Sequence, residues 1–440
     1  MPSPSTHSPF NVAGPVVSAV PASASLPHSG TFARIPQWIR VIDPQDVRMA
    51  DSSHTRGKRI LVTGGAGEMA QYACRALAKA DEVDAVIVAD RDEKKARDFI
   101  TELGPKAEAL ALDISDAEAL SQALADVDIV LNCAGPFYRF GREVLSAAIA
   151  AGTHYLDICD DWEPTLEMLE LSDAARAAGV TAVIGMGASP GTSNMLALLC
   201  MNQLDEVDEM YTVWRAGALP YPEKGKEAEY EPNAAMVHWI HNCTEPIKVF
   251  RDGGLVDAYA LEEIEVAYPG IGAGPVWVCG HPEPLTLPLV RPEIKTSYNT
   301  MNARRGLMEG LQRVAKRVQA GELDVIAAGK QLVIEPNTGG PGAGPSPILP
   351  NLFAVAVGTK DGKKTRVGAQ PLHIPNANMG EATGYPLATA TLMMCRGEVD
   401  NPGVHGPEGA VNPERYFEFL SGLLENRPEG VAYELLTEEI

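Results

Sequence analysis

Short apolar runs alternate with stretches of helical periodicity over the first half of the chain. The runs begin near residues 60, 85, 108, 128, 154 and 180. An apolar run of about four to eight residues between turn signals is typical of a strand buried on both faces of a parallel sheet. Six such strands separated by helices predict a doubly wound α/β (Rossmann) domain with strand order 3-2-1-4-5-6.

The strict alternation stops near residue 200, and the second half predicts an α+β domain that contains an antiparallel sheet. Its predicted elements are strands at 207–214 and 264–267, a segment at 249–256 that carries a turn at 252–254, a helix at 301–319, and a hairpin of strands 352–358 and 365–368. Asp361 and Gly362 lie at the turn of that hairpin, where an Asp-Gly pair suits type I′ geometry. A final helix is predicted at 384–396.

Four segments follow from this pattern. We expect an N-terminal extension at 1–57, the doubly wound domain at 58–200, the α+β domain at 201–383, and a C-terminal helical segment at 384–440. The extension is rich in Ser and Pro and has no basic cluster followed by an unbroken apolar core, so it predicts poor order and no secretory signal. A Gly- and Pro-rich stretch at 338–350 predicts a mobile loop.

The first predicted strand runs into a glycine turn that opens a helix. Gly65, Gly67 and Ala70 occupy the G-x-G-x-x-G/A spacing of dinucleotide-binding folds. In that spacing the first glycine permits a tight turn, and the second lets the backbone approach a pyrophosphate. The small third residue lets the helix pack closely on the strand. The pyrophosphate is expected at the helix N-terminus.

Asp90 ends the second predicted strand, where a carboxylate can accept hydrogen bonds from an adenosine ribose. This favours NAD as the cofactor. Arg91, with Lys94 and Lys95 nearby, can instead hold a 2′-phosphate, so NADP stays open. A glycine turn and a helix-capping Asp in a protein that binds no dinucleotide is the alternative interpretation.

Further cofactor contacts are expected where the other strands end. Asp113 follows the third strand and lies beside an adenine or caps the next helix, and Phe137 and Tyr138 follow the fourth strand and border a nicotinamide. The predicted cofactor-binding residues are Gly65, Ala66, Gly67, Glu68, Met69, Asp90, Arg91, Asp113, Ala134, Gly135, Pro136, Phe137 and Asp157.

Charge and cysteine content narrow the possible partners. The 440 residues carry a formal net charge of −22, which argues against nucleic acid and anionic membrane surfaces and favours a small-molecule substrate. The seven cysteines are odd in number and form no C-x-x-C pair, so we expect reduced thiols and a cytoplasmic protein. No apolar run approaches the roughly 20 residues that span a bilayer.

Three motifs carry a family resemblance. The runs at 132–137 (NCAGPF), 152–157 (GTHYLD) and 187–194 (GASPGTSN) are similar to those of the saccharopine dehydrogenase-like family, as are the stretches at 217–220, 281–288 and 402–408. Many members carry Phe-Asp before the Pro-Gly of the third motif. Ala188 and Ser189 stand there in this chain, so a carboxylate that could lie near the substrate is missing.

The resemblance implies an NAD(P)-dependent oxidoreductase that acts on a carbon–nitrogen bond of a small amine, amino acid or imine, as saccharopine reductases and lysine 6-dehydrogenases do. It further implies amino acid metabolism, a second domain that binds substrate and forms a homodimer, and a C-terminal segment that packs back on the first domain. Two alternatives stay open: reduction of a C=C or C=O bond on the same fold, and a non-catalytic dinucleotide-binding scaffold or sensor.

Clustered acids follow the fifth strand. Asp157, Asp160 and Asp161 lie beside the expected nicotinamide position and could stabilise an iminium or a protonated amine. Asp160 or Asp161 could equally cap the next helix. Tyr138 could donate a proton, and Cys159 is expected to be a small buried apolar residue. We take Asp160, Asp161 and Tyr138 as the catalytic candidates.

Substrate anchors are expected mainly in the second domain. The predicted substrate-binding residues are Asn194, Arg215, Arg291 and Tyr298. Arginine forms bidentate contacts with carboxylates, and Asn194 begins a helix that faces the predicted site, where it binds substrate or caps the helix. His238 and His241 have no third ligand at metal spacing, so no metal is predicted.

The cofactor hypothesis yields a direct test. Replacing Asp90 with Ser should weaken NAD binding about tenfold or more, and NADP binding less, because the lost hydrogen bond is to the 2′-hydroxyl of the ribose. Isothermal titration of both cofactors against both proteins measures this. A larger loss for NADP would mean that Arg91 governs the choice.

Overall fold

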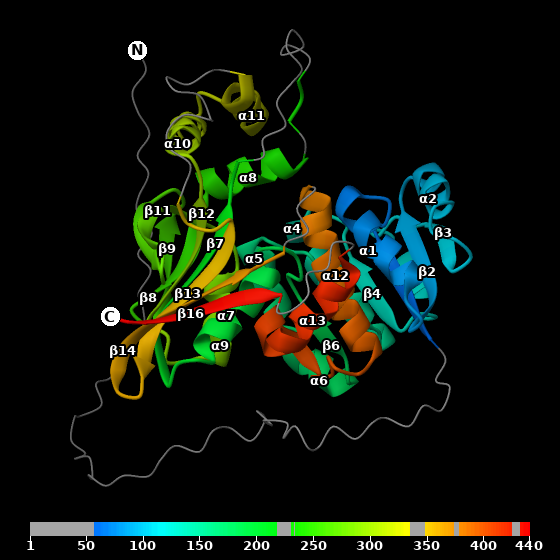
Figure 1. Cartoon of the computed structure of the whole chain (residues 1–440). Helices are drawn as coiled ribbons and strands as arrows, with labels where there is room; N and C mark the ends of the chain where they lie inside the picture. Colours follow the sequence, from blue (N-terminus) through cyan, green and yellow to red (C-terminus); the bar gives the residue numbers. More distant parts are fainter. Residues whose placement is uncertain (1–56, 218–229, 233, 335–347, 374–377, 425–431) are drawn as a thin grey trace, which may run out of the picture. The chain divides into compact units, whose positions relative to one another are not determined.

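The computed structural model describes residues 57–217, 230–232, 234–334, 348–373, 378–424 and 432–440. Residues 56–440 form one compact unit (Figure 1). The predicted extension up to residue 56, most of the predicted loop at 338–350, and the side chain of His238 lie outside the described residues.

The first sheet is parallel and has seven strands in the order β15-β6-β5-β4-β1-β2-β3. The strands are β1 (Lys58–Thr63), β2 (Val83–Asp90), β3 (Ala107–Ala111), β4 (Ile129–Asn132), β5 (His154–Asp157), β6 (Thr181–Val183) and β15 (Gly403–His405). This confirms the predicted Rossmann order. The seventh strand comes from the C-terminal segment and pairs with β6.

Helices cover both faces of the parallel sheet. They are α1 (Glu68–Lys79), α2 (Glu93–Ile100), α3 (Ala117–Leu124), α4 (Phe137–Ala151), α5 (Trp162–Leu169), α6 (Ser172–Ala178) and α7 (Thr192–Met201). Ile60 and Val62 belong to one buried cluster and Leu61 to another. Neighbouring residues of a strand point to opposite faces, so both faces of β1 are buried, which explains its unbroken apolar run.

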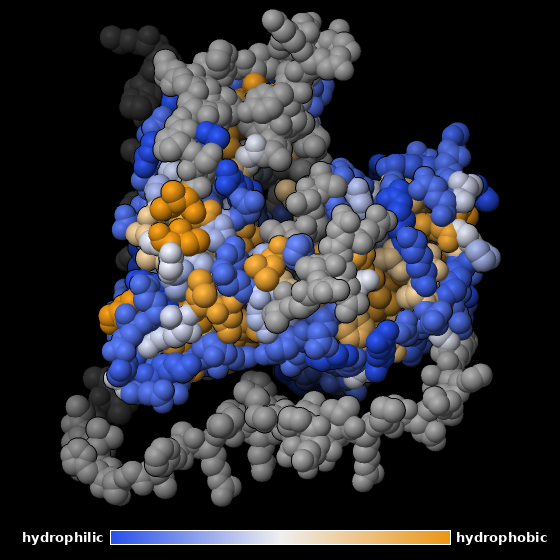
Figure 2. Space-filling model, in the orientation of Figure 1, coloured by the Kyte–Doolittle hydropathy of each residue, from blue (hydrophilic) through white to orange (hydrophobic). Residues whose placement is uncertain are grey.

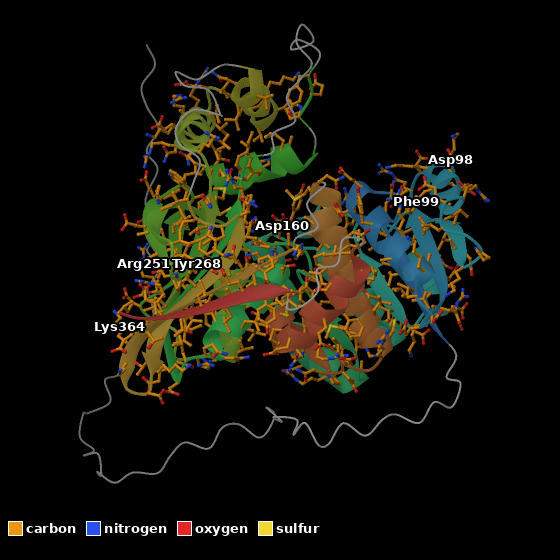
Figure 3. The ribbon with its side chains drawn as sticks, viewed as in Figure 1. Asp98, Phe99, Asp160, Arg251, Tyr268 and Lys364 are labelled. Carbon is orange, nitrogen blue, oxygen red and sulfur yellow. The ribbon has the colours of Figure 1, made fainter. Side chains whose placement is uncertain are left out.

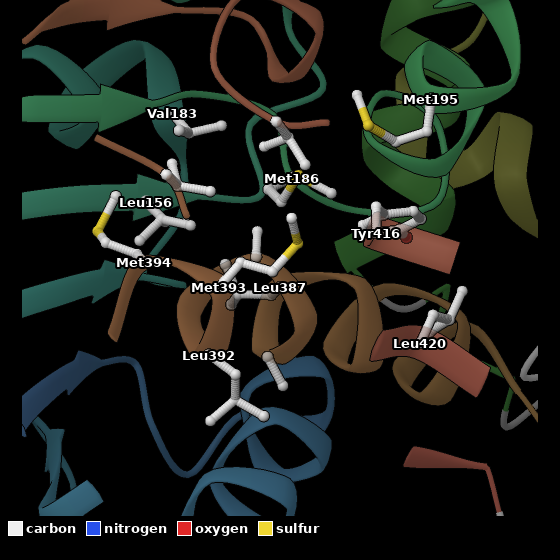
Figure 4. Packing of buried hydrophobic residues seen from close by; sticks show 14 of the residues in the cluster. Leu156, Val183, Met186, Met195, Leu387, Leu392, Met393, Met394, Tyr416 and Leu420 are labelled. Atoms are coloured by element: carbon white, nitrogen blue, oxygen red, sulfur yellow. The ribbon is translucent and has the colours of Figure 1, made fainter. Parts of the chain in front are cut away.

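Helix α12 (Met379–Cys395) packs on α1 and under the ends of β5 and β6. Figure 4 shows Leu387 and Met393 of α12 among Leu156, Met186 and Tyr416, all of which are buried. The α1–α12 contact is close because α12 carries glycines there. A Cβ on Gly384 would lie 2.4 Å from the carbonyl oxygen of Met69.

The second sheet is mixed, with strand order β10-β11-β12-β7-β13-β14-β16, and the hairpin β8–β9 joins it at β12. The strands are β7 (Glu206–Arg215), β8 (Pro246–Arg251), β9 (Gly254–Tyr259), β10 (Glu263–Tyr268), β11 (Gly272–Cys279), β12 (Thr296–Asn302), β13 (Leu352–Lys360), β14 (Lys363–Pro371) and β16 (Tyr433–Glu439). Among the described strands of this sheet, β7 and β12 alone pair in parallel. The β13–β14 turn has positive φ at Asp361 and Gly362, as the predicted type I′ turn requires.

The remaining helices pack around this sheet and its neighbours. They are α8 (Ala234–Thr244), α9 (Glu283–Val290), α10 (Arg305–Gln319), α11 (Val325–Ile334), the 3₁₀ turn η2 (Pro407–Gly409) and α13 (Pro413–Leu423). Helices α8, α10 and α11 lie together at one end of the sheet (Figure 1) and share a buried cluster around Trp277 and Met301.

Several predicted boundaries are wrong. The helix predicted at 301–319 begins at Arg305, because Met301 and Asn302 complete β12. Helix α12 begins at Met379, five residues before the predicted start. Met301 is in a strand because β12 pairs with β7 and β11, and the local periodicity of the sequence does not show such pairing.

Within the described residues no helix is long and apolar enough to cross a membrane. Figure 2 shows the outer face of α2 as hydrophilic, in agreement with the exposed charged side chains of Lys94, Arg97 and Asp98.

The α1–α12 contact predicts a steric cost. Gly384→Ala should lower the free energy of unfolding by about 1–3 kcal/mol, because the added methyl group forces the two helices apart. Gly422→Ala in α13 is the matched control, since a Cβ there meets nothing within 4 Å. It should leave stability unchanged or raise it by up to about 1 kcal/mol. Urea unfolding measures both, and equal effects would contradict the packing argument.

Candidate functional site

The turn between β1 and α1 forms a glycine cradle. Gly64 has φ of 63°, and a Cβ on Gly65 would lie 2.7 Å from the carbonyl oxygen of Val62. Gly67 is the N-cap of α1 and carries no side chain, so no side-chain acceptor occupies the first N–H groups of the helix. A helix N-terminus with bare backbone is suited to bind the pyrophosphate of a dinucleotide, so the residues present fit the predicted cofactor.

Asp90 lies at the end of β2 and touches this turn. Its carboxylate accepts hydrogen bonds from the backbone N–H of Ala66 (3.3 Å) and Asp92 (3.0 Å). Asp113 follows β3 and is bonded to Ser115, and those bonds, with the charges of Arg91 and Arg139, hold its pKa below the ordinary value. Asp116 caps α3 in place of Asp113. Asp113 thus lies free of the helix, on the edge where an adenosine would bind.

A buried polar chain crosses the ends of the central strands. Thr63 donates to Asn132 (2.8 Å), the amide of Asn132 donates to the hydroxyl of Tyr155 (3.2 Å), and Tyr155 donates to Asp157 (2.8 Å). Asp157 also accepts from the backbone N–H of Cys159 and of Gly185. Its carboxylate is fully buried, and burial raises its pKa to about 6. The carboxylate of Asp157, a predicted cofactor-binding residue, therefore forms hydrogen bonds that connect the strand ends inside the protein.

The connection from β4 to α4 provides an open backbone. A Cβ on Gly135 would meet nothing within 4 Å. Ala134 is tied to Asn132 through its N–H, and Pro136 is the N-cap of α4. Phe137 packs into the core, whereas Tyr138 is 71% exposed. Of the two aromatic residues predicted to border the nicotinamide, Tyr138 is therefore the accessible one.

The acidic loop after β5 leads into α5. Asp161 is the N-cap residue of α5, yet its side chain makes no capping hydrogen bond. The charge of Asp160 contributes, after burial and the charges of Cys243 and Glu283, to a raised pKa of Cys279 at the end of β11. Figure 3 labels Asp160 between the elements of the two sheets. Cys159 is fully buried, as predicted.

The loop after β6 meets the second sheet at a buried carboxylate. Ser189 donates to Oε1 of Glu283 (2.5 Å), and Ser193 also donates to this oxygen (2.8 Å). Glu283 opens α9 and is fully buried. The amide of Asn299 on β12 donates to the same oxygen (2.8 Å) and to the hydroxyl of Ser189 (3.0 Å). One carboxylate therefore links the two domains.

Trp214 fixes the orientation of the Asn299 amide. The indole N–H of Trp214 can only donate, and it lies 3.0 Å from Oδ1 of Asn299. The amide nitrogen of Asn299 must therefore face Ser189, Glu283 and Thr212. His281 stacks on the Trp214 ring with centroids 5.2 Å apart. These side chains form the polar wall that the second domain presents to Ser189.

Asn194 is fully buried, and its hydrogen-bonding groups are satisfied inside the protein. Its amide donates to Oε2 of Glu408 (2.7 Å), and its oxygen accepts from the N–H of Gly191 (2.8 Å). The second bond caps α7, which was the alternative interpretation of this residue. Burial raises the pKa of Glu408 to about 7.

The predicted arginine and tyrosine anchors lie elsewhere. Because neighbouring residues of a strand point to opposite faces, Arg215 and Tyr298 lie on the face of the sheet opposite Trp214 and Asn299. Tyr298 accepts from Arg251 (2.8 Å), and Arg215 is exposed and bonded to Asn351. Arg291 donates to the carbonyl oxygens of Met201 and Leu204 past the C-terminal end of α7, whereas Ser189 precedes its N-terminal end.

Sequence reasoning therefore missed the residues that meet Ser189. Glu283, which accepts from Ser189, belongs to the stretch at 281–288, which supported the family resemblance without a chemical role. Among the described residues, no group of three or more His, Cys, Asp or Glu side chains is arranged to hold a metal ion.

Comparisons with known proteins agree on the first domain. Residues 60–183 match the family model described as saccharopine dehydrogenase NADP binding domain. A saccharopine dehydrogenase [NADP(+), L-glutamate-forming] of Schizosaccharomyces pombe is 27% identical over 202 residues, which cover 44% of this chain and 43% of that protein. A trans-acting enoyl reductase of Mycobacterium leprae is 24% identical over 225 residues, which cover 49% of this chain and 52% of that protein.

One solved structure resembles almost the whole chain. Apo saccharopine dehydrogenase (L-Glu forming) of Saccharomyces cerevisiae superimposes with a TM-score of 0.56 at 18% identity, covering 87% of this chain and all of that one. At this identity the likeness shows the shared two-domain fold. The chain spans about half the length, or less, of the curated relatives that it matches.

Asp157 makes stability depend on pH. Folding raises its pKa from 3.8 to about 6. Its stabilising contribution is therefore fully present below pH 3.8 and is lost as the pH rises through 6, by up to roughly 3 kcal/mol. Asp157→Asn should flatten the profile of unfolding free energy between pH 4 and 6, measured by urea unfolding. Asp116→Asn, at an exposed helix cap, is the control and should keep the wild-type slope. An unchanged slope in Asp157→Asn would contradict this account.

Proposed function

We propose that this chain is a member of the saccharopine dehydrogenase-like family and an NAD(P)-dependent oxidoreductase acting on a carbon–nitrogen bond of a small amine, amino acid or imine. The observation that carries the proposal is the glycine cradle at Gly65 and Gly67, where a Cβ would collide with backbone and the start of α1 is left without a side-chain cap. The matching family model covers this same region.

Either nicotinamide dinucleotide suits the end of β2. The family model and the fission yeast relative are both named for NADP, and exposed Arg91 can meet a 2′-phosphate. Asp90 favours NAD, but its oxygens already accept two backbone N–H groups. Rotation of Arg91 toward a phosphate needs no change at Asp90, so we propose that the site takes NADP and tolerates NAD.

The acids at the sheet edge suit a cationic nitrogen. Asp160 and Asp161 lie on the loop after β5. This loop lies close to the loop that carries Ser189, as a Cβ on Gly185 would lie only 3.0 Å from the carbonyl oxygen of Cys159. When bound, the dinucleotide accepts or supplies a hydride. The protein's part is to position the substrate and to lower the energy of the positive charge on its nitrogen, and these two carboxylates would do so.

A second candidate function is reduction of a carbon–carbon double bond. The similarity to trans-acting enoyl reductases favours it. Such a substrate has no cationic nitrogen, so the polar wall of Trp214, His281 and Asn299 and the acids after β5 would have no partner in it. A dinucleotide-binding scaffold without turnover is the third possibility. A homodimer and a cytoplasmic role in amino acid metabolism remain part of the proposal.

A two-step experiment tests the function. In the first step, titration calorimetry with NADP and NAD tests whether the protein binds a dinucleotide. In the second step, absorbance at the reduced-nicotinamide wavelength measures turnover of the dinucleotide with each of four compounds: saccharopine, L-lysine, L-glutamate and an enoyl thioester. Turnover of an amine supports the proposal, and turnover of the thioester alone supports the second candidate. Binding without turnover indicates the scaffold, and no binding of either dinucleotide excludes all three.

Substitution of Asp160 tests whether this residue acts on turnover and not on cofactor binding. Asp160→Asn should lower kcat for the amine about tenfold or more, because the lost charge acts on the reacting nitrogen, and should change the dinucleotide Kd less than about twofold. Stopped-flow turnover and calorimetry measure the two quantities. Asp98→Asn, on exposed α2, is the control. Equal kcat in both variants would reduce Asp160 to a structural role.

A further inference from the structure

Ser189 is partly exposed within a loop that is otherwise mostly buried. Every residue from Thr181 to Ala197 is buried except Ala188 and Ser189. The loop lies at the carboxyl ends of β5 and β6, since Met186 N–H donates to the carbonyl oxygen of Asp157 (2.7 Å). In this strand order the second half of the sheet receives the nicotinamide end of a dinucleotide. Ser189 is therefore the accessible hydroxyl of this loop, on the side where the hydride moves.

The hydrogen bonds of Ser189 have a fixed direction. Glu283 opens α9, and its Oε1 accepts the hydrogen bond of the Ser189 hydroxyl at 2.5 Å. The serine proton is therefore committed to Glu283. The Asn299 amide, which Trp214 holds in place, donates to the same serine oxygen. One lone pair of Ser189 remains, and it can accept a hydrogen bond from outside the network.

We propose that Ser189 takes the proton of the substrate nitrogen and that Glu283 receives the proton of Ser189. This inference rests on the proposed function and names the proton-handling group of the same site. Ser189 would be the catalytic residue, since it touches the nitrogen. Glu283 and Asn299 would be positioning residues, since they act through the serine.

The step balances without a further reactant. A protonated amine loses one N–H proton to the Ser189 oxygen while the Ser189 proton passes to the Glu283 carboxylate. The neutral amine can then lose a hydride from its α-carbon to the oxidised dinucleotide, which leaves an iminium ion and a protonated Glu283. In the reductive direction the same proton returns through Ser189 to the nitrogen as the amine forms.

The network also accounts for the departure from the family pattern at this position. Ser189 stands where many relatives carry Asp, and a second carboxylate 2.5 Å from Glu283 would repel it. In this chain the carboxylate comes from α9 and reaches the site through a hydroxyl.

Ser193 offers a matched control. It donates to the same oxygen of Glu283 as Ser189 does, at 2.8 Å, but it is fully buried on α7 and cannot meet a substrate. Ser189→Ala should lower kcat about 100-fold. It should also weaken amine binding about tenfold in protein loaded with reduced dinucleotide, a complex that cannot oxidise the amine. Ser193→Ala should change either quantity by less than about threefold, although it lowers stability.

A rescue experiment distinguishes proton transfer from packing. In Ser189→Asp with Glu283→Gln, the carboxylate moves to position 189 and the amide keeps the volume of the glutamate. This double variant should recover at least about tenfold in kcat over Ser189→Ala, whereas Glu283→Gln alone should stay low. Calorimetry with saccharopine and L-lysine and stopped-flow turnover of the same amines provide the readouts.

The outcomes separate the two proposals. Amine turnover by the wild type with an unaffected Ser189→Ala, or equal losses in Ser189→Ala and Ser193→Ala, overturns this inference and leaves the proposed function standing. Dinucleotide binding without binding or turnover of either amine also overturns it. Failure of the wild type to bind a dinucleotide overturns both.

Discussion

A fully buried carboxylate, that of Glu283, links the two domains through hydrogen bonds to both of them. Transfer of an unpaired carboxylate into a protein interior costs several kcal/mol or more, so donors must surround it. Glu283 obtains them from both sides: hydroxyls of Ser189 and Ser193 from the parallel-sheet domain, and the amide of Asn299 from the mixed sheet. All three donors bond to Oε1, and Oε2 has no hydrogen-bond partner among the described residues. Neither domain alone supplies the three donors, so this arrangement forms only when the two domains are docked.

The adjacent side chains extend the same logic along the first turn of α7. Thr192 bonds to Tyr416 of α13, Ser193 to Glu283 of α9, and Asn194 to Glu408 of η2. Three consecutive polar side chains thus attach this helix to three elements that come later in the sequence. These contacts explain why a polar Thr-Ser-Asn run occupies a fully buried helix start.

The sequence predicted what depends on local spacing. The glycine turn, the strand order and the Asp-Gly hairpin each require particular residues at fixed offsets, and the structure contains all three. It could not show that Arg215 and Tyr298 point away from Asn299, because strand register fixes the face and register depends on the partner strands. The role of Glu283 was not predicted for a related reason: the residues that donate to it, at 189, 193 and 299, lie more than 15 residues away in the sequence.

The parallel sheet is completed by a strand that is made very late. Thr181 is the first residue of β6 and Asn401 lies just before β15; they are 220 residues apart, yet they are bonded. During synthesis β6 therefore remains an open edge until residues 403–405 have left the ribosome. Contacts of such long range slow folding, and an unpaired strand invites association with other chains. The growing polypeptide therefore carries an exposed strand edge that the finished protein covers with β15.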